Sequence, residues 1–141
     1  KYPDRFFFFF FAEKDMIGTA AGLSLGGKIP FATTYGVFVA GRAWDQIRTT
    51  VCYSNLNVKI AGAHGGISAG GDGATHQALE DIALMRVLPN MRVIVPCDAI
   101  EARKATVPAT SRGLVFCGLP GKRRRYSPRR EISSPSAKPM F

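Results

Sequence analysis

Apolar and polar positions follow one another along the chain in two patterns, one typical of strands and one of helices. Short apolar stretches predict strands at residues 6–11, 29–34, 58–61, 92–95 and 114–117. Apolar positions three or four apart predict helices over residues 13–26, 37–54, 75–88 and 98–109. Such alternation indicates an α/β fold, a three-layer sandwich with a mostly parallel sheet of about five or six strands.

Three of the expected helices have ends with recognisable capping residues. Gly26 and Gly27 are typical of the end of the first helix. Thr75 is the expected N-cap of the third helix. Asp98 and Glu101 have the spacing of a capping box at the start of the last. These signals support the helical assignments independently of the apolar pattern.

The composition changes after Cys117. Residues 112–141 hold eight Lys or Arg and one acid, whereas residues 1–111 hold eleven Lys or Arg and nine acids. Most of the net charge of +9 therefore lies in a basic, Ser/Pro-rich tail and not on a binding face. We expect a domain over residues 1–117 and a tail over residues 118–141 that is disordered or aberrant. An RNA-binding tail is the alternative.

Length and composition exclude several classes of protein. The 141 residues suffice for one domain with one core. No apolar stretch reaches the roughly 20 residues of a membrane span. The cysteines, Cys52, Cys97 and Cys117, are widely spaced and form no CxxC motif, so neither a disulfide framework nor a zinc site is expected. A reducing cytoplasm suits them.

The glycine-rich segment over residues 63–77 holds the most chemistry. It contains Asp72 and the only two histidines of the chain, His64 and His76. Glycine lets the backbone approach a ligand, and histidine transfers protons near neutral pH. Two alternatives remain open: an ordinary surface loop, and a metal site with these three side chains as ligands but no fourth.

Two further features concern a carboxylate and an aromatic pair. Glu13 begins the first helix, where it either favours the helix dipole or hydrogen-bonds a heteroaromatic ring. Tyr35 and Phe38 follow the second strand, and core packing is the usual reason for such a pair. The spacing does not choose between these interpretations.

Residues 4–98 resemble the pyrimidine-binding domain of transketolases, above all the separate C-terminal subunit of split forms. The resemblance covers about two thirds of the chain, and its matching segments are AEKDMIG, GRAWDQIR, LNVKI, DGATHQ and MRVLPNM. It implies the pyrimidine module of the thiamine diphosphate-binding fold. It also implies transfer of a two-carbon ketol unit between sugar phosphates in the pentose phosphate pathway.

The resemblance implies a role for each candidate residue. Glu13 is implied to be catalytic, because it hydrogen-bonds ring nitrogen N1′ of the cofactor and so helps the exocyclic nitrogen take the proton from thiazolium C2. Tyr35 and Phe38 are implied to surround the aminopyrimidine. His64 is implied to bind the substrate phosphate. Asp72 and His76 are implied to contact hydroxyls at the reacting end, with His76 also catalytic.

The same resemblance implies a partner chain. Gly71-Asp72-Gly73 begins like the family's diphosphate–Mg²⁺ motif, but no asparagine follows at the required spacing. We therefore expect no metal ligand here. Mg²⁺ and the diphosphate are expected on a diphosphate-binding subunit or domain, in a homodimer or heterotetramer, with no membrane or nucleic-acid partner.

Two alternatives to a transketolase stay open. Deoxyxylulose-phosphate synthases share the DGxTHQ pattern, but they usually carry arginine at the position of His64. A truncated, non-catalytic partner of transketolase subunits is the other. Three departures from the family favour it: the phenylalanines at residues 6–11, Gly71 in place of a glutamate, and the tail.

Overall fold

The computed structural model describes residues 2–109, 113 and 115–120, so the expected tail lies outside the described residues from position 121 onward. The described residues form one four-stranded parallel sheet in the order β1-β2-β4-β3. Its strands are β1 (Phe31–Tyr35), β2 (Lys59–Gly65), β3 (Arg92–Ile94) and β4 (Val115–Pro120).

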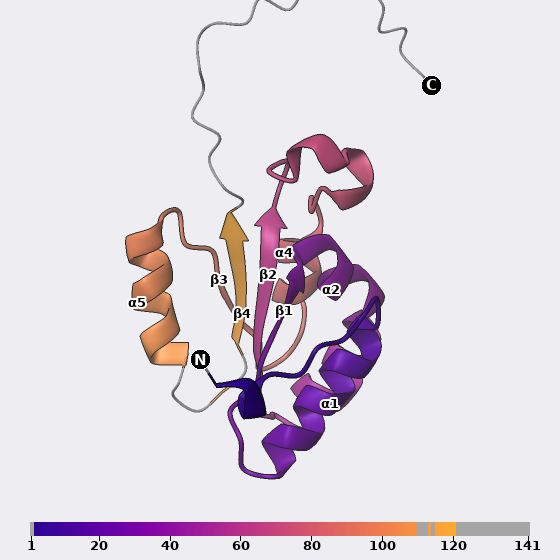
Figure 1. Cartoon of the computed structure of the whole chain (residues 1–141), viewed down its shortest axis with the longest axis vertical. Coiled ribbons are helices and arrows are strands. Elements are labelled where there is room, and N and C mark those ends of the chain that lie inside the picture. Colours follow the sequence, from indigo (N-terminus) through magenta and orange to yellow (C-terminus); the bar gives the residue numbers. More distant parts are fainter. Residues whose placement is uncertain (1, 110–112, 114, 121–141) are drawn as a thin grey trace, which may run out of the picture.

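Helices cover both faces of this sheet, as Figure 1 shows. α1 (Glu13–Leu25), α2 (Gly36–Arg42) and α4 (Asp81–Arg86) lie on one side, and α5 (Ala99–Ala109) lies on the other. The strand order explains this arrangement. The chain steps in one direction from β1 through β2 to β3 and then returns to β4, so right-handed crossovers place α5 on the opposite face. The predicted three-layer α/β architecture is confirmed.

The core lies between the sheet and the larger helical layer. Ile17 of α1, Val39 of α2, and Ile60 and Phe116 of the sheet are each at most 1% exposed. Gly62 of β2 allows the start of α2 to approach, because a Cβ there would lie 2.9 Å from Phe116 Cζ and 3.0 Å from the Gly36 Cα. This close contact fixes α2 directly after the end of β1.

Two predicted caps are present. Gly27 has a φ of +79°, and the amides of Gly27 and Lys28 donate to the carbonyls of Ser24 and Leu23, which is the Schellman arrangement. Before α5, the Glu101 amide donates to Asp98 Oδ1 at 2.8 Å. The Glu101 carboxylate in turn accepts from the Cys97 amide at 2.8 Å.

The predicted first strand is wrong. Residues 6–11 lie outside the sheet, and Phe6, Phe8, Phe10 and Phe11 are each more than 70% exposed. A strand that is apolar on both faces needs cover on both faces, and no layer of the described structure supplies it here. The sheet of the described residues consequently has four strands and not five or six.

The third predicted helix is also wrong over its first half. Residues 74–76 form a 3-10 turn, and α4 begins only at Asp81. The amide and the carbonyl of Ala78 pair with Gly66, both at 3.0 Å, so they are not available to a helix. Thr75 caps nothing, and its hydroxyl lies 2.9 Å from His76 Nδ1.

Smaller differences concern the second helix and the strand ends. The helical stretch predicted over residues 37–54 divides at Ala43 into α2, α3 (Trp44–Gln46) and a π-helical segment (Ile47–Cys52). β2 continues to Gly65, into the predicted loop, and β4 continues to Pro120. A 3-10 turn (Pro3–Arg5) precedes the phenylalanines. No helix among the described residues is long and apolar enough to span a membrane.

Candidate functional site

The six predicted site residues meet at the carboxyl edge of the sheet, the edge where parallel α/β folds bind ligands. Tyr35 ends β1, and His64 is the second-last residue of β2. Asp72 and His76 lie in the 3-10 turns Gly70–Asp72 and Ala74–His76 that follow β2. Glu13 begins α1, and Phe38 lies in the first turn of α2.

A cavity of about 330 Å³ opens beside four of these residues, Glu13, Tyr35, Phe38 and His76. The remaining lining residues are Phe8, Phe9, Phe10, Phe11, Ala12, Met16, Thr33 and Thr34. Most of the wall is therefore aromatic or apolar, and one carboxylate reaches it. Such a cavity suits a flat heteroaromatic ring that has a polar nitrogen at one edge.

The aromatic side chains of the site form one cluster around Tyr35. The Tyr35 ring stacks on His64, with centroids 4.6 Å apart and planes at 25°. His76 stands edge-on to Phe38 at 5.0 Å and to Tyr35 at 5.7 Å. Tyr35 and Phe38 are 5.6 Å apart. These are ordinary geometries for aromatic pairs, and they hold both imidazoles against the cavity residues.

Asp72 joins the cluster through a hydrogen bond. The Tyr35 hydroxyl donates to Asp72 Oδ2 at 3.2 Å. The negative charge of Asp72, together with this hydrogen bond, raises the pKa of Tyr35. Tyr35 therefore remains a neutral donor, and it links the two loop turns to the end of β1.

His64 has an unusual backbone conformation. Its φ is +56°, a region that costs a residue other than glycine roughly 1–3 kcal/mol. The pairing of β2 with β4 is irregular between Gly62 and Gly65, at the same place. The Nδ1 atom of His64 is buried and has no hydrogen-bond partner among the residues that the structure describes. An unpaired imidazole nitrogen on a strained backbone is more typical of a ligand contact than of a core residue.

Glu13 is a buried carboxylate with one cationic neighbour. It is 7% exposed, and both its oxygens lie near Arg42 Nη1, at 3.2 and 3.4 Å. The Arg42 guanidinium also covers the ring of Phe38, with Cζ 4.1 Å from the centroid. Arg42 was not among the predicted site residues. Its position four residues after Phe38 on one helix is the signal that could have identified it.

The metal-site interpretation of the loop finds no support in the structure. Among the described residues, no group of three His, Cys, Asp or Glu side chains is placed to hold an ion. His64 instead stacks on Tyr35, and Asp72 accepts its hydrogen bond. The aromatic ring thus lies between side chains that a metal site would bring together.

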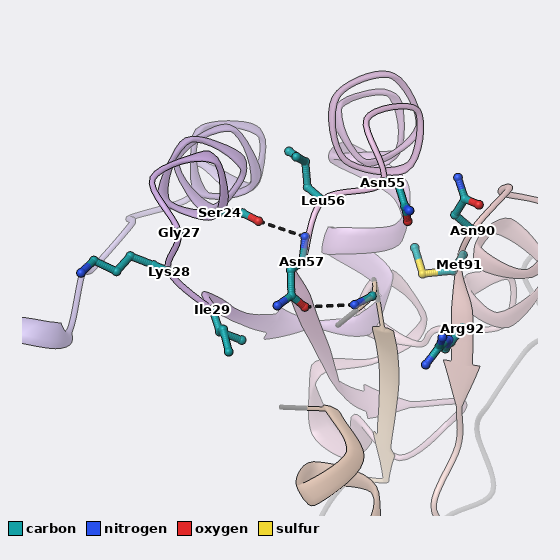
Figure 2. A pocket seen from close by; sticks show the side chains of 11 residues that line it. Ser24, Gly27, Lys28, Ile29, Asn55, Leu56, Asn57, Asn90, Met91 and Arg92 are labelled. Carbon is teal, nitrogen blue, oxygen red and sulfur yellow. Dashed lines mark hydrogen bonds between the residues drawn. The ribbon is translucent and has the colours of Figure 1, made fainter. Parts of the chain in front are cut away.

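A second, larger hollow of about 1070 Å³ lies at the opposite edge of the sheet (Figure 2). Its lining residues precede or begin the strands, among them Ile29, Asn57, Arg92 and Gly113. Asn57 already makes hydrogen bonds within the protein there. Its backbone amide donates to Ser24 Oγ at 2.9 Å, and its side-chain Oδ1 accepts from the Gly113 amide at 3.2 Å. The lining holds no carboxylate and no imidazole. The smaller cavity is therefore the better candidate for catalysis.

Comparisons with known proteins identify the family of the domain. The family described as "Transketolase, pyrimidine binding domain" matches residues 1–117. The chain is 45% identical to a 6-deoxy-6-sulfo-D-fructose transketolase subunit of Clostridium sp. (strain MSTE9), over 67% of this chain and 29% of that protein. It is 43% identical to one of the subunits of an apulose-4-phosphate transketolase from Phocaeicola vulgatus, over 66% of this chain and 30% of that protein.

A solved structure is similar in both sequence and fold. It is described as a split gene transketolase, an inactive β4 tetramer, and it is 51% identical to this chain with a TM-score of 0.73. The alignment covers 90% of this chain and 41% of that one. The chain therefore spans less than half the length of these relatives.

Proposed function

We propose that this chain forms half of a ketol-transfer site. The premise is that the chain belongs to the transketolase family through its pyrimidine-binding domain. The reaction moves a two-carbon ketol unit between sugar phosphates, with thiamine diphosphate as cofactor. A diphosphate-binding subunit or domain completes the site. The assembly is a homodimer or heterotetramer that acts in the pentose phosphate pathway of the cytoplasm.

The observation that carries the proposal is the aromatic cavity with the Glu13 carboxylate at its wall. Tyr35 and Phe38 offer ring faces, and the buried carboxylate of Glu13 offers an acceptor. These three side chains therefore fit the aminopyrimidine end of the cofactor. When bound, thiamine diphosphate would supply the carbon nucleophile and the electron sink for ketol transfer. Glu13 would hold a proton at ring nitrogen N1′, and the surrounding apolar side chains would strengthen that contact by excluding water.

The two histidines and Asp72 would act on the sugar phosphate. His76 touches the cavity and the ring of Phe38, so it is placed to exchange a proton with a substrate hydroxyl near the cofactor. Asp72 lies farther along the cluster, where it would accept a hydrogen bond from another hydroxyl. His64, which stacks on Tyr35 at the end of β2, would bind the phosphate.

The partner chain follows from the chemistry of the cofactor. The cavity wall is mostly apolar, and its one charged side chain is the acid Glu13. An acid repels a diphosphate, so we assign the diphosphate and Mg²⁺ to the diphosphate-binding subunit. The descriptions of two relatives as subunits, and of one solved relative as an inactive β4 tetramer, support a need for that partner.

A coupled ketol-transfer assay tests the proposal. The chain is co-expressed with a diphosphate-binding transketolase subunit and supplied with thiamine diphosphate, Mg²⁺, xylulose 5-phosphate and ribose 5-phosphate. Glu13→Gln keeps the shape of the side chain and removes the charge at N1′, so we expect a loss of activity of about 100-fold or more.

Asp15→Asn is the matched control. Asp15 is exposed, lies two residues further along α1 and loses the same charge. We expect its activity to equal that of the wild type. Wild-type activity in Glu13→Gln would contradict the assigned chemistry.

A non-catalytic partner is the second candidate, and the phenylalanines favour it. Phe8, Phe9, Phe10 and Phe11 line the cavity and narrow its approach to Glu13. Stable co-purification with a diphosphate-binding subunit, without ketol transfer and without thiamine diphosphate binding, would support this candidate over the enzyme.

A further inference from the structure

Arg42 connects two of the three residues that we assign to the aminopyrimidine, Glu13 and Phe38. Its Nη1 lies 3.2 and 3.4 Å from the two oxygens of Glu13, and its Cζ lies 4.1 Å from the ring centroid of Phe38. Glu13 comes from α1 and Phe38 from α2, so one side chain joins the two elements at the cavity. We propose that Arg42 is a positioning residue, which holds the Glu13 carboxylate and the Phe38 ring in the arrangement that the cofactor requires.

The ion pair leaves Glu13 able to bind a ligand. A carboxylate has about four lone-pair positions, and a single nitrogen of Arg42 approaches both oxygens. Among the described residues, no other cation pairs with this carboxylate. A buried carboxylate without a counter-charge is costly, so Arg42 both stabilises the charge and fixes the direction in which the remaining lone pairs point.

Arg42 acts from outside the cavity. It is not one of the lining residues, whereas Glu13 and Phe38 are. Its side chain is 49% exposed, so the guanidinium reaches the surface beyond the two residues that it holds. The contact with Phe38 follows from the helix, since residues four apart share a face. A cation on a phenylalanine face also limits rotation of the ring.

The inference rests on the proposed function and is tested on the same complex. The first measurement is the dissociation constant of thiamine diphosphate, with Mg²⁺, by calorimetric titration of the chain assembled with a diphosphate-binding subunit. Arg42→Gln loses the ion pair and the cation on Phe38, so we expect cofactor binding about tenfold weaker. We also expect a lower kcat with the KM for sugar phosphate unchanged, because the contacts of Arg42 are with Glu13 and Phe38, to which we assign the cofactor and not the sugar.

Two further variants separate positioning from structure. Arg42→Lys keeps a charge near Glu13 but loses the planar group over Phe38, so its cofactor affinity should lie between those of the wild type and Arg42→Gln. Arg48→Gln is the matched control. Arg48 is exposed, its Cζ lies 5.9 Å from the Trp44 ring, and it pairs with no acid among the described residues. Its affinity should equal that of the wild type.

Each contrary outcome has a distinct meaning. Wild-type affinity and kcat in Arg42→Gln, while Glu13→Gln binds the cofactor weakly, would overturn the positioning role and leave the proposed function intact. Tighter binding in Arg42→Gln would make Arg42 a competitor of the cofactor and would also overturn the role. Equal losses in Arg42→Gln and Arg42→Lys, matched by equal losses of unfolding temperature, would assign Arg42 to structure alone. Undiminished affinity in Glu13→Gln, or no cofactor binding by the wild-type complex, would overturn both proposals.

Discussion

Two buried acids begin helices in this domain, and their surroundings differ. Glu13 begins α1 and is 7% exposed, and Asp81 begins α4 and is 4% exposed. Glu13 has Arg42 as its counter-charge, whereas Asp81 has no ion-pair partner among the described residues. Burial raises the pKa of Asp81, against the hydrogen bonds from the backbone amides of Ile82 and of Asp81 itself. The fold therefore favours the protonated form of Asp81.

A pH dependence follows for Asp81. Because its pKa is higher in the folded state, its contribution to the free energy of unfolding is complete below the unfolded pKa of about 4 and is lost as the pH rises through the folded pKa. Asp81→Asn has the same shape and does not titrate. Urea unfolding should show the variant gaining stability relative to the wild type as the pH rises from about 4 to 7. A difference that does not change with pH would contradict this assignment.

At the scale of residues, the structure brings the six candidates together, but the sequence did not predict their contacts. The six candidates lie together because strand ends and helix starts meet at one edge of a parallel sheet. The stacking of Tyr35 on His64 and the Arg42–Glu13 pair join segments that are 29 residues apart in each case. Contacts between such distant segments depend on the packing of whole elements, and no local pattern encodes them.

At the scale of elements, local signals succeeded where the pairing of the backbone is also local. The end of α1 and the start of α5 were predicted because their caps involve residues a few positions apart. The non-helical conformation of residues 75–80 was not predicted, because the backbone of Ala78 pairs with that of Gly66 and not with residues of its own helix. The strand predicted for the phenylalanines at residues 6–11 was wrong, because a strand also needs a neighbouring strand to pair with, and apolar content alone does not provide one.

Gly62 offers a test of how β2 and α2 fit together. Its missing Cβ would lie 2.9 Å from Phe116 Cζ and 3.0 Å from the Gly36 Cα, so Gly62→Ala should destabilise the domain by about 1–3 kcal/mol. Gly18→Ala is the control, because its Cβ would have no neighbour within 4 Å and alanine favours a helix interior. Chemical denaturation should show the control equal to or more stable than the wild type by about 0.5–1 kcal/mol. Equal effects at both positions would refute the close approach.

The exposed phenylalanines should govern self-association of the isolated chain. An uncharged aromatic run without proline is prone to aggregate. Phe6 and Phe7 are 71% and 59% exposed and do not line the cavity. Replacing both with serine should lower light scattering of the purified chain and leave its unfolding midpoint unchanged. Leu25→Ser, at an isolated residue that is 74% exposed, should change neither quantity. Unchanged light scattering in the double variant would show that the exposed phenylalanines do not cause self-association.

At the scale of the whole molecule, alternation predicted a parallel sheet between two helical layers, but it did not predict the order β1-β2-β4-β3. That order places β4 inside the sheet and leaves the carboxyl ends of β1 and β2 side by side. The cavity at this edge is open, and Glu13 is the one carboxylate in its lining. Our proposal that a diphosphate-binding subunit or domain forms the other wall rests on this open cavity.

The most direct test of this account is a titration of activity against the partner. A fixed amount of a diphosphate-binding transketolase subunit is mixed with increasing amounts of this chain, at saturating thiamine diphosphate and Mg²⁺, and ketol transfer is measured. We predict no activity from either chain alone, and a rise that saturates when the two are equimolar. Activity of this chain alone, or activity of the partner that does not depend on it, would contradict a shared active site.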